Sequence, residues 1–134
     1  MMDKNIADFM GEIIALRDEG KEDAAVKCAK EMLERFPFDY GVHMFASSMY
    51  GKMGKPLESM TEAAIALAIA PKVSVTYHFL AKKLTTLGMS VLAERVLENG
   101  WEIARKELGI RQSRNPEEKV KYFTIPESSS AQPA

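Results

Sequence analysis

The chain has 134 residues, of which 46% are hydrophobic and 28% are charged, and its formal net charge is −1. This length allows one domain with a buried core, and the composition is typical of a soluble globular protein. The charge excludes a general attraction to nucleic acid or to an anionic membrane, and no apolar run approaches the roughly 20 residues that span a bilayer.

The cysteine content and the amino-terminal residues predict a cytoplasmic protein. Cys28 is the only cysteine, so no intrachain disulfide can form and a reducing compartment is the simple inference. Residues 1–20 carry Asp3, Asp8 and Glu12 within their apolar pattern and no small-residue cleavage site, which argues against a signal peptide.

The first two predicted helices form a pair that ends at a proline. Residues 3–19 place apolar side chains three and four positions apart, which predicts a helix with Asp3 as its N-cap. Gly20 can adopt the left-handed backbone that ends a helix. A second apolar stripe, which includes Cys28, stops before Pro37, because proline lacks the N–H that a continuing helix needs.

The next pair has the same layout. Asp39 can cap a third helix that ends at Gly54. Pro56 suits the first turn of a fourth helix, which Pro71 closes.

A third pair follows. The fifth helix is expected over about residues 72–87, before Gly88, and the sixth begins near Ser90. Arg105 stands where the earlier pairs have their closing proline, so the sixth helix should continue to Gly109.

The breaks between the helices recur at one period. Gly20, Gly54 and Gly88 are 34 residues apart, and so are Pro37 and Pro71. Short loops force consecutive helices to pack antiparallel, and one hairpin cannot bury both of its faces, so the hairpins must stack. The sequence therefore predicts an all-α fold, an array of three helical hairpins with six helices.

This repeat resembles the tetratricopeptide repeat family. In the central unit the family's pattern of large and small residues falls on Ala46, Ser47, Tyr50, Gly54, Ser59, Ala63, Ala66 and Pro71. The first unit departs from the pattern at Glu12 and Ile13, where the family usually has leucine and a small residue.

The resemblance implies a right-handed superhelix over residues 1–109, with units at about 6–39, 40–73 and 74–109. Residues 110–134 are expected to form a C-terminal segment with at most a short helix and a disordered end.

The resemblance also implies a concave face, lined by the first helix of each unit, that binds peptides or proteins and performs no chemistry. The residues expected there are Met10, Ile14, Arg17, Met44, Ser48, Lys52, Val75, His78 and Lys82. Known peptide-binding members hold a C-terminal carboxylate with lysine and asparagine side chains, and this chain lacks that set. We expect an apolar, methionine-rich groove that becomes mildly basic and that takes an extended or amphipathic segment rather than a chaperone C-terminal tail.

Enzyme, metal and cofactor sites are not indicated. His43 and His78 lie on different predicted helices without a cysteine or carboxylate at ligand spacing, so packing is expected rather than metal binding. Cys28 lies on an apolar stripe and is expected to be a buried, inert thiol. A basic cluster between Arg105 and Lys121 is interrupted by glutamates, which is typical of a solvated helix end rather than of a nucleic-acid surface.

The last hairpin lacks an obvious capping helix, so its apolar residues are expected to form a contact surface. Residues proposed for self-association are Val96, Trp101, Ile103, Leu108, Tyr122 and Phe123. Either residues 120–125 fold back over this surface or into the groove, or two chains meet there as a homodimer, the arrangement that we favour.

Three functions fit this architecture. The leading hypothesis is a small cytoplasmic adaptor that binds a partner's peptide or amphipathic segment. One alternative is a dedicated chaperone resembling the three-repeat translocator chaperones of bacterial type III secretion. The other is a scaffold that assembles through the end of the array.

Overall fold

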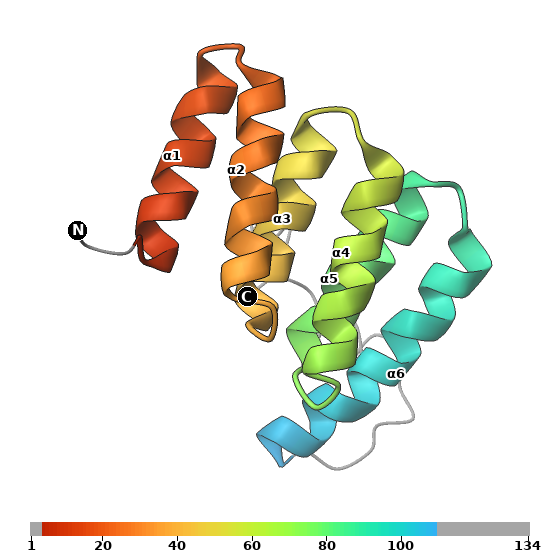
Figure 1. Cartoon of the computed structure of the whole chain (residues 1–134). Coiled ribbons are helices and arrows are strands. Elements are labelled where there is room, and N and C mark those ends of the chain that lie inside the picture. Colours follow the sequence, from red (N-terminus) through yellow and green to blue (C-terminus); the bar gives the residue numbers. More distant parts are fainter. Residues whose placement is uncertain (1–3, 110–134) are drawn as a thin grey trace, which may run out of the picture.

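The computed structural model describes residues 4–109, which fold into six helices without a strand (Figure 1). The helices are α1 (Ile6–Asp18), α2 (Glu22–Arg35), α3 (Tyr40–Lys52), α4 (Pro56–Ile69), α5 (Ser74–Thr86) and α6 (Ser90–Leu108). The all-α array of hairpins predicted from the sequence is confirmed. Expectations for residues 110–134, including Tyr122 and Phe123, fall outside the described residues.

The helix starts follow local capping chemistry. The side chain of Asn5 accepts from the backbone N–H of Asp8 at 2.8 Å, and the Asp8 carboxylate accepts from the N–H of Asn5 at 3.0 Å. This reciprocal box makes Asn5 the N-cap of α1, so the prediction of Asp3 was wrong. The predicted cap of α3 is confirmed, since the Asp39 carboxylate accepts from the N–H of Val42 at 3.0 Å.

The turns inside the three hairpins are closed in the same way. Gly20, Gly54 and Gly88 have φ angles of 78°, 72° and 80°, in the left-handed region that glycine adopts without steric cost. In each turn, the residue after the glycine donates its N–H to the carbonyl five residues earlier at 2.9 Å. The 34-residue spacing in the sequence is therefore the spacing of one repeated helix-ending motif.

Replacing Gly54 with alanine should lower the free energy of unfolding by about 1–2 kcal/mol, because an L side chain is strained at this φ. An added Cβ would meet no atom within 4 Å at Gly54 or at Gly11, so crowding plays no part. Gly11 lies inside α1 without a positive φ, and Gly11→Ala should stabilise the chain by about 0.5–1 kcal/mol. Urea denaturation measures both variants; a change of the same sign in both would contradict the prediction.

The hairpins stack so that first and second helices form two layers. The two helices of each hairpin pack together, and α2 packs on α3 as α4 packs on α5. Figure 1 shows α2 and α4 in front of α3 and α5. The first helices α1 and α3 also touch directly. One face of the array therefore belongs to α1, α3 and α5.

The apolar core falls into two clusters. The first joins α1, α2 and α3 through Phe9, Ile13, Ala25, Cys28, Ala29, Met32, Val42, Ala46, Met49, Tyr50 and Met53. The second joins α4, α5 and α6 through Ala63, Leu80, Ala81, Leu84 and Ala93. The division between the clusters runs through the middle hairpin, between α3 and α4.

Polar side chains fill that division, and we call His43, Ser47, Ser59 and Glu62 the polar seam. The Ser47 hydroxyl donates to the backbone oxygen of Ser59 at 2.5 Å, and the Ser59 hydroxyl donates to the backbone oxygen of Ser47 at 2.7 Å. His43 Nε2 lies 2.8 Å from the backbone oxygen of Pro37, and Nδ1 lies 2.6 Å from Glu62 Oε1. A carbonyl oxygen only accepts, so Nε2 carries a hydrogen. The buried polar groups therefore satisfy one another across the two helices.

Leu57, an apolar residue in the first turn of α4, is 64% exposed and lies outside both clusters. One detail of the predicted helices differs from the structure. The fifth helix begins at Ser74 rather than near Lys72. The extension of the sixth helix is confirmed: α6 runs to Leu108 and ends at Gly109, whose φ is 66°.

Candidate binding groove

All the residues expected in the groove lie on the first helices, and none of them is fully buried. They are Met10, Ile14 and Arg17 on α1, Met44, Ser48 and Lys52 on α3, and Val75, His78 and Lys82 on α5. Ile14 and Val75 are each 38% exposed, so large apolar side chains reach the surface on α1 and α5. A partner could therefore contact side chains on each first helix.

The methionines divide between this face and the core. Met44 is half-buried and belongs to neither core cluster, whereas Met10 is half-buried and packs against the first cluster. Met32, Met49 and Met53 are core residues, 0%, 4% and 8% exposed. The high methionine content thus serves the core as well as the first-helix face.

Arg17 is held close to its own helix. Its guanidinium Nη2 lies 2.8 Å from Asp18 Oδ1, and Nη1 lies 4.0 Å from Met49 Sδ. The Asp18 carboxylate compensates the charge of Arg17, so positive charge at the α1 end of the face is reduced.

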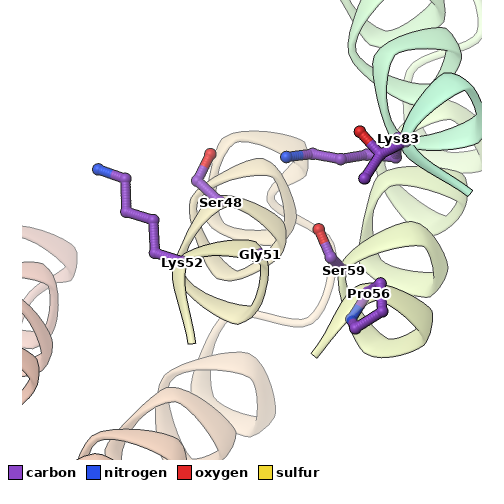
Figure 2. Close-up of a pocket in the computed structure, with 7 residues that line it drawn as sticks. Ser48, Gly51, Lys52, Pro56, Ser59 and Lys83 are labelled. Carbon is purple, nitrogen blue, oxygen red and sulfur yellow. The ribbon is translucent and has the colours of Figure 1, made fainter. Parts of the chain in front are cut away.

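A pocket of about 280 Å³ opens between α3, α4 and α5 (Figure 2). Its lining residues are Ser48, Gly51, Lys52, Pro56, Ser59, Lys83 and Thr86. In Figure 2 the Lys83 side chain extends from α5 towards Ser48 on α3, while the amine of Lys52 points away from it. The structure thus brings together Ser48 and Lys52, which the sequence predicted, with Lys83, which it did not.

Glycine at position 51 leaves the room for this pocket. A Cβ there would lie 3.3 Å from Ser59 Oγ and 3.5 Å from Lys83 Nζ. An added Cβ would require a small shift of the Ser59 hydroxyl and would lie in van der Waals contact with the Lys83 ammonium, so Gly51 keeps this side of the pocket open.

The charged side chains that line the pocket, Lys52 and Lys83, are both positive. Burial is the main cause that lowers the pKa of Lys83, and the charges of Lys82 and Lys52 lower it further. Lys83 Nζ lies 5.0 Å from the centre of the Phe79 ring. Within residues 4–109, neither Lys52 nor Lys83 forms an ion pair with a carboxylate.

Cys28 and His43, the other residues considered as candidate sites, both make hydrogen bonds inside the helix array. Cys28 donates to Glu12 Oε2 at 2.9 Å, and burial and this hydrogen bond raise the pKa of its thiol to about 12. A protonated, buried thiol is a poor nucleophile at neutral pH. His43 belongs to the polar seam. Across residues 4–109 there is no cluster of three potential metal ligands, and no helix there is long and apolar enough to cross a membrane.

The predicted self-association surface is only partly exposed. Trp101 is 2% exposed and so lies in the interior rather than on an open patch. Val96 and Ile103 are half-buried, and Leu108 is 58% exposed. Self-association through these residues stays a prediction.

Comparisons with known proteins identify the fold. No protein-family model and no curated protein sequence matches the chain. A solved structure described as the first TPR of Spaghetti (RPAP3) bound to the HSP90 peptide SRMEEVD is similar, with a TM-score of 0.59 and 15% sequence identity. The match covers 92% of this chain and 91% of that one. At this identity the likeness establishes the tetratricopeptide-repeat fold of the array.

Proposed function

We propose that this chain, which has the tetratricopeptide-repeat fold, is a non-catalytic interaction module that binds a segment of a partner protein. The observation that carries the proposal is the partial exposure of Met10, Ile14 and Met44 on the adjacent helices α1 and α3. Partly exposed apolar side chains that gather on one face are typical of a protein-binding surface. Methionine adapts its shape to a partner, which suits an extended or amphipathic segment.

The similar solved structure supports a peptide as the ligand, since that protein was solved with one. That peptide is an HSP90 segment, and the expected ligand of this chain differs. At the places where peptide-binding members carry lysine and asparagine for a C-terminal carboxylate, this chain has Met10 with Ile14, Met44 with Ser48, and His78 with Lys82. We therefore propose an apolar contact along α1 and α3 as the main source of affinity, in an adaptor or in a chaperone for one client.

The test selects ligands from a random peptide library displayed on phage and measures their affinity by fluorescence anisotropy. Met10→Glu together with Met44→Glu should weaken binding at least about tenfold, because each change removes apolar contact and introduces a charge that must be desolvated. Met44→Glu alone should show most of the loss without disturbing the core, since Met44 lies outside both clusters.

The control is the pair Leu57→Glu and Val91→Glu, which introduces the same charges on second helices. Leu57 and Val91 are 64% and 70% exposed, so both variants should fold, and their affinity should stay within about twofold of the wild type. Equal losses in the two pairs, or no loss in the methionine pair, would contradict a binding site on the first-helix face.

A further inference from the structure

The pocket beside Lys83 has a different chemistry from the apolar surface of α1 and α3. We propose that it binds the side-chain carboxylate of an aspartate or glutamate in the partner segment. This inference rests on the proposed function, because it specifies one residue of the segment that the first-helix face would bind. The lysines involved are Lys52 and Lys83, which are not the positions at which the family's peptide-binding members hold a terminal carboxylate.

The first step is the charge imbalance at the pocket. Lys83 is half-buried, and the lysines at positions 52 and 82 act on it with the same sign of charge. No carboxylate within residues 4–109 pairs with Lys52 or Lys83. Within the described residues, the Lys83 ammonium is therefore partly desolvated and lacks a counter-ion, which an anionic ligand would supply.

The second step is the shape and the donor set. The cavity of about 280 Å³ has room for one acidic side chain. The Lys83 ammonium lies on one side of it and the Ser48 hydroxyl, on α3, faces it (Figure 2). The Ser59 hydroxyl is already donated to the backbone oxygen of Ser47, and the Thr86 hydroxyl to that of Lys82. Lys83 and Ser48 are thus the donors that a carboxylate would meet, with Lys52 at the rim.

The third step is continuity with the apolar face. Ser48 lies one turn after Met44 on α3, so a segment bound on Met44 can reach the pocket mouth. A partner segment with an acidic residue beside its apolar residues matches this arrangement. The same ammonium and hydroxyl donors could also bind a phosphorylated serine, which carries more negative charge than glutamate.

The experiment uses the full chain and the same displayed peptide library. Peptides selected on the wild type should be enriched in Asp or Glu at one position, and peptides selected on the variant Lys52→Gln with Lys83→Gln should lose that enrichment. A selected peptide is then synthesised with Glu, Gln or phosphoserine at that position. On the wild type the Glu form should bind about tenfold more tightly than the Gln form, and on the double variant the two should bind within about twofold.

The matched control is Lys27→Gln with Lys30→Gln, which removes the same charge from exposed positions of α2 and should keep the tenfold preference. Lys83→Arg keeps a cation in the pocket and should retain a preference for Glu. Thermal unfolding of each variant confirms that it is folded.

The outcomes separate this inference from the proposed function. The pocket assignment would be overturned by peptides whose binding depends on Met10 and Met44 but shows no preference for an acidic residue. It would also be overturned if that preference persisted in the Lys52→Gln, Lys83→Gln variant. Both results would leave the proposed function standing. A preference for phosphoserine over Glu of more than about tenfold would overturn the carboxylate in favour of a phosphate. Failure to select any peptide on the first-helix face would overturn both.

Discussion

Replacing His43 with leucine should lower the free energy of unfolding by about 3 kcal/mol. The His43 and Glu62 side chains are only 8% and 15% exposed, and Nδ1 lies 2.6 Å from Glu62 Oε1. Leucine removes the partner of a carboxylate that is largely withdrawn from water, and it leaves the Pro37 carbonyl without the hydrogen bond from Nε2. Breaking one side of a buried polar pair costs more than the pair contributes, because the remaining group stays desolvated. Urea denaturation at neutral pH measures the loss.

The double variant His43→Leu with Glu62→Leu is the control for this interpretation. With both polar groups gone, apolar packing between α3 and α4 should recover most of the stability, as it does when buried ion pairs are replaced by apolar residues of similar size. A double variant that is less stable than His43→Leu alone would show that the two residues contribute independently and would contradict the coupling.

Ala63→Leu should destabilise the chain by about 1–3 kcal/mol through overpacking. Ala63 is 0% exposed and packs in the second cluster with Leu80, Ala81 and Leu84 of α5. A small side chain here lets α4 and α5 approach closely, and three added carbon atoms would force the helices apart or the leucines out of their rotamers. The denaturant midpoint is the measurement.

Ala68 offers a matched position on the same helix. It is exposed on α4, so Ala68→Leu should change the free energy of unfolding by less than about 0.5 kcal/mol. If Ala63→Leu were as mild as Ala68→Leu, the crossing between α4 and α5 would have space that the structure does not show.

The turns were predictable because they depend on local chemistry. A glycine in the left-handed region and a helix-starting residue leave a signal in the sequence, and three glycines at one period identified every hairpin turn. The start of α1 was misplaced although the signal was present, since Asn5 and Asp8 have the spacing of a capping box. Asp3 is an equally good capping residue type, and apolar spacing alone does not choose between them.

The site was less predictable because it depends on neighbouring helices. Apolar periodicity placed Met10, Met44 and Lys82 on the free face of the first helices, and the structure leaves each at least partly exposed. Apolar periodicity did not identify Lys83 as a pocket residue. Lys83 lines the pocket because α3 lies close to α5, with Gly51 beside the Lys83 ammonium group. The helical repeat also gave no sign of the polar seam, since serine at positions 47 and 59 fits a pattern of small residues equally well.

The polar seam has a consequence for the geometry of the whole array. Apolar burial is non-directional, so it specifies the alignment of two helices less sharply than directional hydrogen bonds do. The reciprocal bonds between Ser47 and Ser59 are directional and exist in one alignment of α3 and α4. A slip of one turn would strand both hydroxyls in a dry interior. The middle hairpin thus fixes the alignment of α3 and α4, and with it the relative placement of the helices that line the pocket.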